Sequence, residues 1–254
     1  MKKTPVSVNL EEFPRQFHPL LAKAVYDSSC SPEARVWFLE PGYYLKRAPK
    51  GALQREAEMT RFLHEKQLAA EVAAYERLEQ DWLLTAAVPG EDCTHEKYLA
   101  DPKRLCETTA ALLRQLHGLS PEGCPVGNHT KTYLQTVGSN YAAGRFDPVF
   151  FPGITAEEAF ALVEEHAKYL KTDTLLHGDY CLPNIMLDDW KFSAFIDLDH
   201  GGAGDRHVDV FWGIWTLQFN LHTDAYAQRF LDAYGRENIE PELLRVVAAA
   251  ECFG

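Results

Sequence analysis

The chain has 254 residues, 46% of them hydrophobic, and a formal net charge of −12. This length suffices for one large domain or for two lobes with a sizeable core. A protein this acidic lacks the basic surface that nucleic acids require, so we expect no nucleic-acid partner. Its acidity would suit a cationic substrate, because an acidic cleft concentrates cations, although many cytoplasmic proteins are simply acidic and soluble.

Neither a leader peptide nor a membrane span is expected. Residues 1–9 contain no apolar core of the length that a signal peptide needs, and no run of 18 apolar residues occurs in the chain. None of the six cysteines forms a Cys-x-x-Cys pair, which argues against a zinc or redox motif. We therefore expect a cytoplasmic protein with reduced thiols and no membrane partner, as a monomer or a dimer.

The first part of the chain predicts a small α+β unit. Residues 34–39 have the composition of a strand, and residues 43–47, rich in aromatic side chains, are its expected partner across a short turn. Apolar residues then recur at helical intervals over residues 52–65. A hairpin followed by a helix is therefore expected.

A lobe boundary is expected near residue 86. Residues 81–90 begin as an apolar strand and end in a Pro-Gly turn, and helical patterns dominate after it. We expect a nucleotide-binding lobe over residues 1–86 and a catalytic and substrate-binding lobe over residues 87–254.

Helices are predicted at three places in the second lobe. Apolar residues between Leu105 and Leu116 mark one face of a helix. Residues 155–158 form a capping box, Thr-Ala-Glu-Glu, that opens another. Pro241 can start a final helix that runs nearly to the C-terminus.

A β-hairpin is expected in the middle of this lobe. Residues 185–187 and 192–196 are apolar, and residues 188–191 can connect them. Such a hairpin would bring Asn184 and Asp197, which flank it, back together. That is the geometry needed for two ligands on one metal ion.

Three polar side chains have the spacing of a kinase-type phosphoryl-transfer site. Asp179 follows His177 and Gly178, Asn184 comes five residues later, and Asp197 comes thirteen beyond that. Such a site uses one carboxylate to orient and deprotonate a hydroxyl, and an amide oxygen and a second carboxylate to hold Mg²⁺ on the phosphates of ATP. We assign Asn184 and Asp197 to magnesium. Gly178 replaces the arginine of the protein-kinase loop, which points to kinases of small molecules.

The chain resembles the aminoglycoside 3′-phosphotransferases, the kanamycin kinases. The resemblance rests on residues 177–186, 195–198 and 205–209, and it extends to residues 116–119, Ser31-Pro32, Arg35-Val36, Glu251 and Phe253. It implies an α+β, bilobal, protein-kinase-like fold. A small antiparallel-sheet lobe would hold ATP, and a mostly helical lobe would carry the catalytic loop and the substrate cleft.

The resemblance also implies roles for three residues around the catalytic loop. Asp179 would be the catalytic base or would orient the substrate hydroxyl. Asp209 would steady the loop, and we expect His177 to brace the backbone rather than to transfer protons.

Lys46 is the expected ligand of the α- and β-phosphates. Kinase-like folds place a lysine on this strand and pair it with a helix glutamate. Glu56 and Glu58 both lie on the following predicted helix, on different faces. The local match at Arg55-Glu56 favours Glu56 as the partner.

The nucleotide loop has no Gly-x-Gly-x-x-Gly pattern. Residues 27–31 stand in its place, where Ser29 and Ser31 can present backbone N–H groups to phosphate. By resemblance, the strand end from Thr85 to Ala87 would supply backbone groups to the adenine base. ATP is the expected nucleotide, with GTP as an alternative.

Acidic residues are the candidates for holding the ammonium groups of a cationic substrate: Asp147, Glu157, Glu158, Glu251 and the terminal carboxylate. The resemblance favours Glu251, together with Phe253. The chain departs from the family pattern at Ala250, where another acid is usual, at Gly254, which adds one residue, and at Asp199, where glycine is usual.

Together these features predict transfer of the γ-phosphoryl group of Mg-ATP to a hydroxyl. The resemblance implies the 3′-hydroxyl of an aminoglycoside antibiotic and hence antibiotic resistance. One alternative is a kinase of another hydroxylated metabolite, such as an amino sugar or an amino alcohol. The other is a catalytically silent, kinase-like binding protein, against which the intact set of catalytic and metal-binding residues argues.

Overall fold

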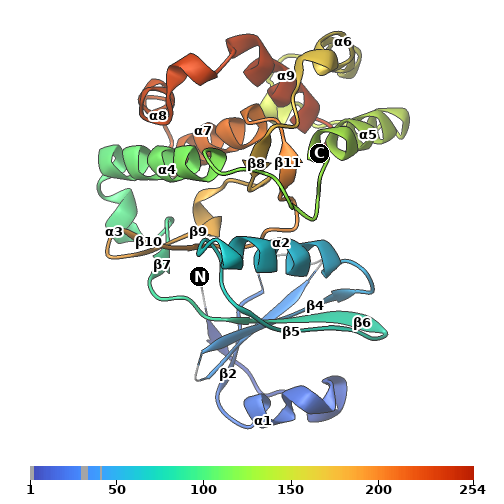
Figure 1. The fold of residues 1–254 in the computed structure, drawn as a ribbon, viewed down its shortest axis with the longest axis vertical. Helices are drawn as coiled ribbons and strands as arrows, with labels where there is room; N and C mark the ends of the chain where they lie inside the picture. Colours follow the sequence, from blue (N-terminus) through green and yellow to red (C-terminus); the bar gives the residue numbers. More distant parts are fainter. Residues whose placement is uncertain (1–2, 30–33, 41) are drawn as a thin grey trace. The chain divides into compact units, whose positions relative to one another are not determined.

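The computed structural model describes residues 3–29, 34–40 and 42–254. The chain divides into two compact units, each described here by itself (Figure 1). The first unit consists of Met1–Asp92 and Pro183–Asp199, and the second of Cys93–Leu182 and His200–Gly254.

The first unit therefore takes in two segments that lie beyond the predicted boundary at residue 86. Backbone pairing explains why. Strand β7 (Glu91–Asp92) pairs with β9 (Ile185–Asp188) in one antiparallel sheet. The Phe195 amide also donates to the Leu68 carbonyl at 2.8 Å, which ties the 183–199 segment to the chain after the first long helix.

A six-stranded sheet in the order β1-β2-β3-β4-β6-β5 forms the body of the first unit, and every neighbouring pair is antiparallel. The strands are β1 (Thr4–Pro5), β2 (Val25–Asp27), β3 (Arg35–Leu39), β4 (Tyr43–Pro49), β5 (Val72–Arg77) and β6 (Gln80–Ala86). Strands β3 and β4 are the predicted hairpin, which is confirmed.

Each face of this sheet has its own core, because successive side chains of a strand point to opposite faces. Trp82 and Leu84 of β6 belong to a buried cluster with Trp37 and Leu45. The cluster also includes residues of the N-terminal segment, which contains the 3-10 turns Leu10–Glu12 and Arg15–Phe17 and helix α1 (His18–Leu21).

The opposite face packs against helix α2 (Gln54–Glu65), the helix predicted over residues 52–65. Leu83 of β6 forms a buried cluster there with Leu53 and Ala57. Figure 1 shows the sheet between α1 and α2.

The predicted hairpin after Asn184 is present and is closed by a two-residue turn. Strand β9 pairs with β10 (Lys191–Phe195). Asp189 and Trp190, at the turn, have φ values of 46° and 68°. Positive φ at both central residues is typical of the type I′ turn, whose twist matches that of the flanking strands.

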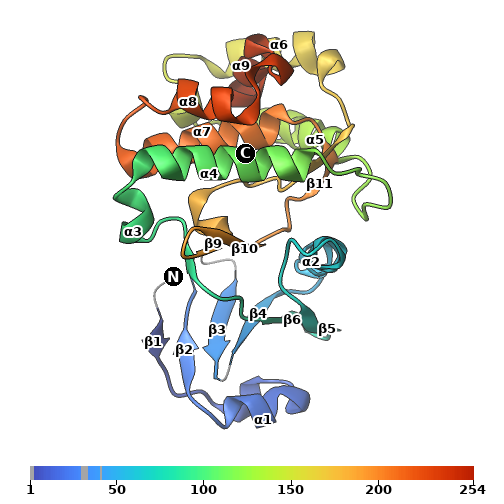
Figure 2. The same ribbon diagram turned by 60° about the vertical axis from the view of Figure 1, so that its left-hand side comes forward.

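The second unit is mostly helical (Figure 2). It contains one two-stranded sheet, β8 (Thr174–Leu176) with β11 (Gly202–Gly204). Its helices are α3 (Glu96–Leu99), α4 (Pro102–His117), α5 (His129–Ala142), α6 (Ala156–His166), α7 (His207–Leu221), α8 (Ala227–Tyr234) and α9 (Pro241–Glu251), with 3-10 turns at Pro148–Phe150, Ala167–Tyr169, Leu182–Asn184 and Arg236–Asn238.

The helices predicted from the sequence are confirmed as α4, α6 and α9. The capping box of α6 is complete, since the Thr155 hydroxyl accepts the Glu158 N–H at 3.2 Å and the Glu158 carboxylate accepts the Thr155 N–H at 2.9 Å. One buried core of this unit joins α5, α6 and α9 and includes Phe253. The described cysteines are free thiols. Across the described residues, no helix combines the length and the apolar character needed to cross a membrane.

Gly90 is required where the chain leaves β6. Its φ is +91°, and a Cβ there would clash with the Leu187 carbonyl of β9. We expect Gly90→Ala to lower the free energy of unfolding by about 2 kcal/mol or more, because a left-handed backbone and a close approach both exclude a side chain. Thermal or urea denaturation measures this.

Gly138→Ala is the matched control for the same chemical change. Gly138 lies inside α5, and a Cβ there would have no neighbour within 4 Å. We expect a gain of about 1 kcal/mol from the higher helix propensity of alanine. Equal effects of the two substitutions would contradict this account of Gly90.

Candidate functional site

Lys46 forms the centre of the site in the first unit. Its ammonium group lies 2.8 Å from Glu56 Oε2 and 2.8 Å from Asp197 Oδ1. The three residues come from β4, from α2 and from the segment after β10. Asp197 is therefore brought to Lys46 and Glu56 from a distant part of the sequence.

Strand register and helix periodicity explain this meeting. Lys46 is paired across the sheet with Leu83, so both side chains lie on the face that α2 covers. On α2, Glu56, Thr60 and Leu63 are buried at helical intervals and form one face. Glu58 is exposed and instead accepts a hydrogen bond from Gln54 at 2.9 Å. The structure thus pairs Lys46 with Glu56 and not with Glu58.

Two carboxylates share this one ammonium group. Burial opposes the charged form of Lys46, but Glu56 and Asp197 outweigh burial and hold the pKa of Lys46 above its ordinary value. Burial raises the pKa of Glu56 to about 7, although Lys46 acts in the opposite direction. The two shifts are compatible because the cluster carries one positive and two negative charges. The excess negative charge favours a proton on Glu56, the more buried acid.

Asn184 and Asp197 are held together by the β9–β10 hairpin that separates them in sequence. The Ile196 amide donates to the Asn184 carbonyl at 3.0 Å. Asp197 then takes a left-handed backbone with φ 59°, which a short polar residue tolerates better than most. Both side chains line the same cavity.

This cavity, which we call the nucleotide cavity, measures about 230 Å³ and lies wholly within the first unit. The predicted residues Lys46, Glu56, Thr85, Asn184 and Asp197 all line it. Ser28, from the predicted nucleotide loop, and Ala86, from the predicted adenine-binding strand end, line it as well. The remaining lining is mostly apolar or aromatic and was not predicted: Ala34, Val36, Tyr44, Thr60, Ala70, Leu83, Val88, Pro183, Met186, Phe195 and Ile196.

Ser29 and Ala87, which were predicted to bind the nucleotide, are not among the residues that line this cavity. The Ser29 N–H donates to Asp27 Oδ1 at 2.9 Å, and the Ser29 hydroxyl accepts the Val36 N–H at 3.0 Å. Ser28, one residue earlier, is the serine that lines the cavity. The Ala87 N–H donates to the Gly42 carbonyl at 2.9 Å. Ser31 lies outside the described residues.

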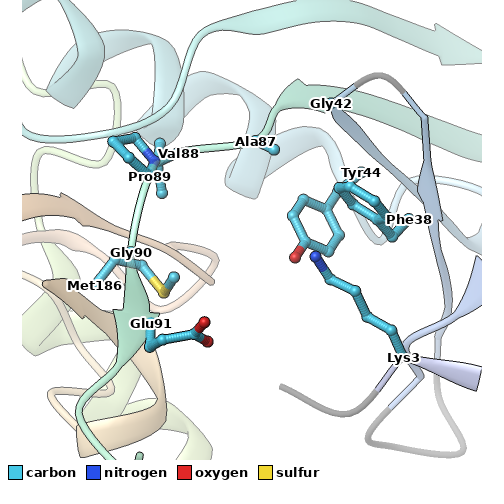
Figure 3. A pocket seen from close by; sticks show the side chains of 10 residues that line it. All are labelled: Lys3, Phe38, Gly42, Tyr44, Ala87, Val88, Pro89, Gly90, Glu91 and Met186. Carbon is cyan, nitrogen blue, oxygen red and sulfur yellow. The ribbon is translucent and has the colours of Figure 1, made fainter. Parts of the chain in front are cut away.

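A second cavity of about 470 Å³ adjoins the strand end and shares Tyr44, Val88 and Met186 with the first. Figure 3 shows the Lys3 side chain on one side of it and Glu91 on the other. The Lys3 ammonium lies 3.5 Å from the centroid of the Phe38 ring, a cation–π contact. Ala87 belongs to the wall of this second cavity.

The donor set fits a magnesium ion bound together with a nucleotide. Mg²⁺ prefers oxygen ligands and usually takes one or two from the protein and the rest from phosphates and water. The Asn184 amide and the Asp197 carboxylate supply oxygens of this type. No group of three or more His, Cys, Asp or Glu side chains elsewhere in the described chain could hold a metal ion.

The predicted catalytic loop, which we define as residues 177–182, belongs to the second unit and is held by Asp209. The two carboxylate oxygens of Asp209 accept the N–H groups of His177 and Gly178, each at 2.7 Å, and one also contacts His117 Nε2 at 3.0 Å. Burial opposes ionisation, but the His117 ring and the His177 contacts hold the pKa of Asp209 below its usual range. Gly178 has φ +87°, and a Cβ there would clash with the His200 carbonyl.

Asp179 comes directly after His177 and Gly178, whose N–H groups Asp209 accepts, and is half-buried. Its N–H lies 3.4 Å from His177 Nδ1, and its carbonyl accepts the Cys181 N–H at 2.8 Å. The Cys181 thiol hydrogen-bonds the Asp179 carboxylate, and burial together with this acid raises the pKa of the thiol. His177 is fully buried, as expected of a residue that braces the loop.

Glu251 is the acid that the structure places near Asp179. It is buried in α9 and accepts the Tyr133 hydroxyl at 2.8 Å, and the Trp212 side chain hydrogen-bonds the same carboxylate. Burial raises the pKa of Glu251 to about 7, against these two hydrogen bonds, and Asp179 adds to the rise. Sequence reasoning did not identify Tyr133 or Trp212, which have no local motif.

The other predicted substrate residues have different surroundings. The Phe253 side chain is buried against Tyr141 and Phe146, in the core that joins α5, α6 and α9. Asp147 is exposed and caps the 3-10 turn after it by accepting the Val149 N–H at 3.0 Å. Glu157 is an exposed residue in the first turn of α6.

Comparison with known proteins gives consistent matches. The profile of a phosphotransferase enzyme family matches residues 32–247. A protein of Lactococcus lactis named as a probable aminoglycoside 3′-phosphotransferase is 47% identical over 97% of each chain. The aminoglycoside 3′-phosphotransferase of Streptomyces fradiae is 28% identical over 87% of each chain.

Solved structures share the fold at low sequence identity. An aminoglycoside-3′-phosphotransferase of type VIII matches with a TM-score of 0.73 at 22% identity, over 99% of this chain and 94% of that chain. An aminoglycoside phosphotransferase from Streptomyces rimosus, in complex with ADP and streptomycin, matches with a TM-score of 0.68 at 22% identity, over 86% and 90% of the two chains. The predicted fold class is therefore confirmed.

The anchoring of the catalytic loop by Asp209 can be tested by substitution. Asp209→Ala leaves two amides and a histidine nitrogen buried without their acceptor, so we expect a loss of about 3–5 kcal/mol in the free energy of unfolding. Because the pKa of Asp209 is lowered by folding, its stabilisation is present above the unfolded pKa and is lost as the pH falls through the folded value. Urea denaturation at several pH values measures both effects.

Asp232→Ala is the control, because Asp232 is an exposed aspartate paired with Arg236 at 2.8 Å. We expect this substitution to change stability little, since exposed ion pairs contribute little. Similar losses in both variants would contradict the anchoring role of Asp209.

Proposed function

The chain belongs to the phosphotransferase enzyme family, among the aminoglycoside 3′-phosphotransferases, and on this premise we propose that it transfers the γ-phosphoryl group of ATP to an aminoglycoside hydroxyl, the 3′-hydroxyl by analogy with its relatives. The observation that carries the proposal is the double contact of Lys46 with Glu56 and Asp197. Kinase-type sites use this lysine–glutamate pair to align the phosphates and this aspartate to bind the metal. Phosphorylation would inactivate the antibiotic and so confer resistance.

The nucleotide cavity is suited to a purine nucleotide. Its walls are largely apolar and include the aromatic ring of Tyr44, against which a base can stack, and the strand end at Thr85 offers backbone groups at the edge. Lys46 lies in the wall of the same cavity and would hold the phosphates. A relative with bound ADP supports nucleotide binding here, with ATP as the proposed donor.

Asn184 and Asp197 would hold Mg²⁺, which neutralises phosphate charge during transfer when it is bound. In the structure, the Lys46 ammonium group contacts one of the two carboxylate oxygens of Asp197. With a nucleotide bound, Lys46 would hold the phosphates, and both carboxylate oxygens of Asp197 would be available to the metal ion. The rate gain would come from positioning and charge neutralisation rather than from covalent chemistry.

Asp179 would accept the proton of the acceptor hydroxyl or orient that hydroxyl. Its loop is fixed by Asp209, so the carboxylate is preorganised by the backbone behind it. Glu251, electrostatically coupled to Asp179, would hold an ammonium group of the acceptor. Because the reaction consumes ATP, we place the enzyme in the cytoplasm.

The proposal is tested by following ADP release with Mg-ATP and three acceptors: kanamycin, a 3′-deoxy aminoglycoside and choline. We expect turnover of kanamycin alone and no turnover without Mg²⁺. Asp179→Asn should lower kcat by about a hundredfold or more while ADP binding persists, because the acid acts on the acceptor. Turnover of choline only would favour a metabolite kinase, and no turnover with intact ADP binding would favour a silent binding protein.

Glu251 should make acceptor capture depend on pH. Its carboxyl is ionised above pH of about 7 and protonated below it. As the pH falls below this value, we expect kcat/KM for kanamycin to fall by about tenfold per pH unit, since a neutral carboxyl cannot pair with an ammonium group.

Glu251→Gln is the control for this pH dependence. The amide keeps the shape of the side chain but carries no charge, so kcat/KM should be low at all pH values and the slope below pH 7 should be absent. An unchanged pH profile in the variant would assign the titration to another group.

A further inference from the structure

We propose that an aromatic stripe on the second unit forms a wall of the acceptor site, against which a ring of the substrate packs. The stripe consists of Phe150, from the 3-10 turn Pro148–Phe150, and of Trp212, Trp215 and Phe219 on α7. This inference rests on the proposed function and explains how the site would select its acceptor. The expected ligand is a cationic amino sugar or aminocyclitol with an apolar ring face.

The stripe is continuous along one face of α7. Trp212, Trp215 and Phe219 follow one another at intervals of three and four residues, which places them on the same side of the helix. The ring centroids of Trp212 and Trp215 are 5.4 Å apart, and those of Trp215 and Phe219 are 5.0 Å apart with nearly parallel planes. Phe150 packs edge-on against both tryptophans.

This face is incompletely covered by the rest of the chain. Phe219 is 61% exposed, and Phe150, Trp212 and Trp215 are only partly buried. Large contiguous aromatic surface exposed to water is costly and marks contact with a ligand or a partner. Trp212 also packs against the buried cluster of Leu176, Val208 and Val247, but Trp215 and Phe219 are not part of that cluster.

The stripe is joined to the catalytic loop and to Glu251 by specific contacts. Trp212, at one end of the stripe, hydrogen-bonds the Glu251 carboxylate. The negative charge of Asp179 raises the pKa of the same carboxylate. Thr216, adjacent to Trp215, accepts the Leu182 N–H of the catalytic loop at 3.1 Å. The same hydroxyl-bearing side chain hydrogen-bonds Cys181. The aromatic stripe is therefore continuous with the residues that we assign to acceptor binding.

The chemistry of the stripe complements a cationic sugar. The face of an aromatic ring is electron-rich and attracts an ammonium group, and it also packs against the apolar C–H face of a saturated ring. Glu251, when it is ionised, supplies a negative charge at one end of the stripe. Asp209 is the only acid on α7, and it is buried under the catalytic loop. Along this helix, ring faces rather than carboxylates would therefore contact the acceptor.

Two substitutions in the full-length enzyme test the stripe. Phe219→Ser changes an exposed side chain and should not affect folding, whereas Trp215→Ala removes the ring at the centre of the stripe. We expect the KM for kanamycin to rise by about tenfold in Trp215→Ala and less in Phe219→Ser, with kcat and the KM for ATP nearly unchanged. Trp215→Phe keeps an aromatic face and should restore most of the affinity.

Tyr169→Ser is the matched control, because Tyr169 is an aromatic residue of the same unit, 54% exposed, outside the stripe. Its KM for kanamycin should equal that of the wild type. An unchanged KM in both stripe variants would overturn the proposal. An altered oligomeric state with unchanged kanamycin affinity would overturn it as well and assign the stripe to contact between copies of the chain.

Calorimetric titration of kanamycin without nucleotide separates this inference from the proposed function. If the wild type binds kanamycin but does not phosphorylate it, the proposed function fails, and weaker binding in Trp215→Ala still supports the stripe. If the wild type phosphorylates kanamycin and the stripe variants bind it with unchanged Kd, the proposed function holds and the stripe proposal fails.

Discussion

The nucleotide side of this protein depends on one ammonium group that holds two carboxylates. Lys46 lies 2.8 Å from both Glu56 and Asp197. Burying charges is costly unless they are paired, and here the pairing leaves one negative charge in excess. In the mechanism that we propose, the metal ion would be held by Asp197 and the phosphates by Lys46, so these new contacts would replace the present one between the two side chains.

Asp209 has a comparable role in the loop that carries Asp179, the residue we propose acts on the acceptor hydroxyl. A single buried carboxylate receives two consecutive amides of the catalytic loop and one histidine nitrogen, so the backbone before Asp179 has few ways to move. Gly178 is part of this constraint, since its positive φ and the nearby His200 carbonyl leave no room for a side chain. The glycine that distinguishes this loop from that of protein kinases is therefore required by the local packing.

Much of the fold could be predicted because its signals are local. The strand-like composition of residues 34–39 and 43–47, the helical spacing after residue 52 and the capping box at Thr155 depend on neighbours within a few residues. The spacing of Asn184 and Asp197 predicted their convergence because a short hairpin has few geometries. The cavity wall could not be predicted in the same way. Ser28 and Met186 line the same cavity although they lie far apart in the sequence, the one just after β2 and the other in β9 of a different sheet, and no local pattern separates Ser28 from Ser29.

The acceptor side shows why charge alone is an incomplete guide to a substrate site. Of the acids predicted to hold ammonium groups, Glu251 is buried and electrostatically coupled to Asp179, whereas Asp147 caps a turn. An acid that is exposed to water attracts a cation weakly, because the solvent screens it. A single buried carboxylate flanked by aromatic faces can bind a cation more strongly and can also recognise the shape of the ring that carries it. Selectivity for an amino sugar would then arise from the combination of Glu251 with Trp212 and its neighbours, and the net charge of the protein would mainly raise the local concentration of cations.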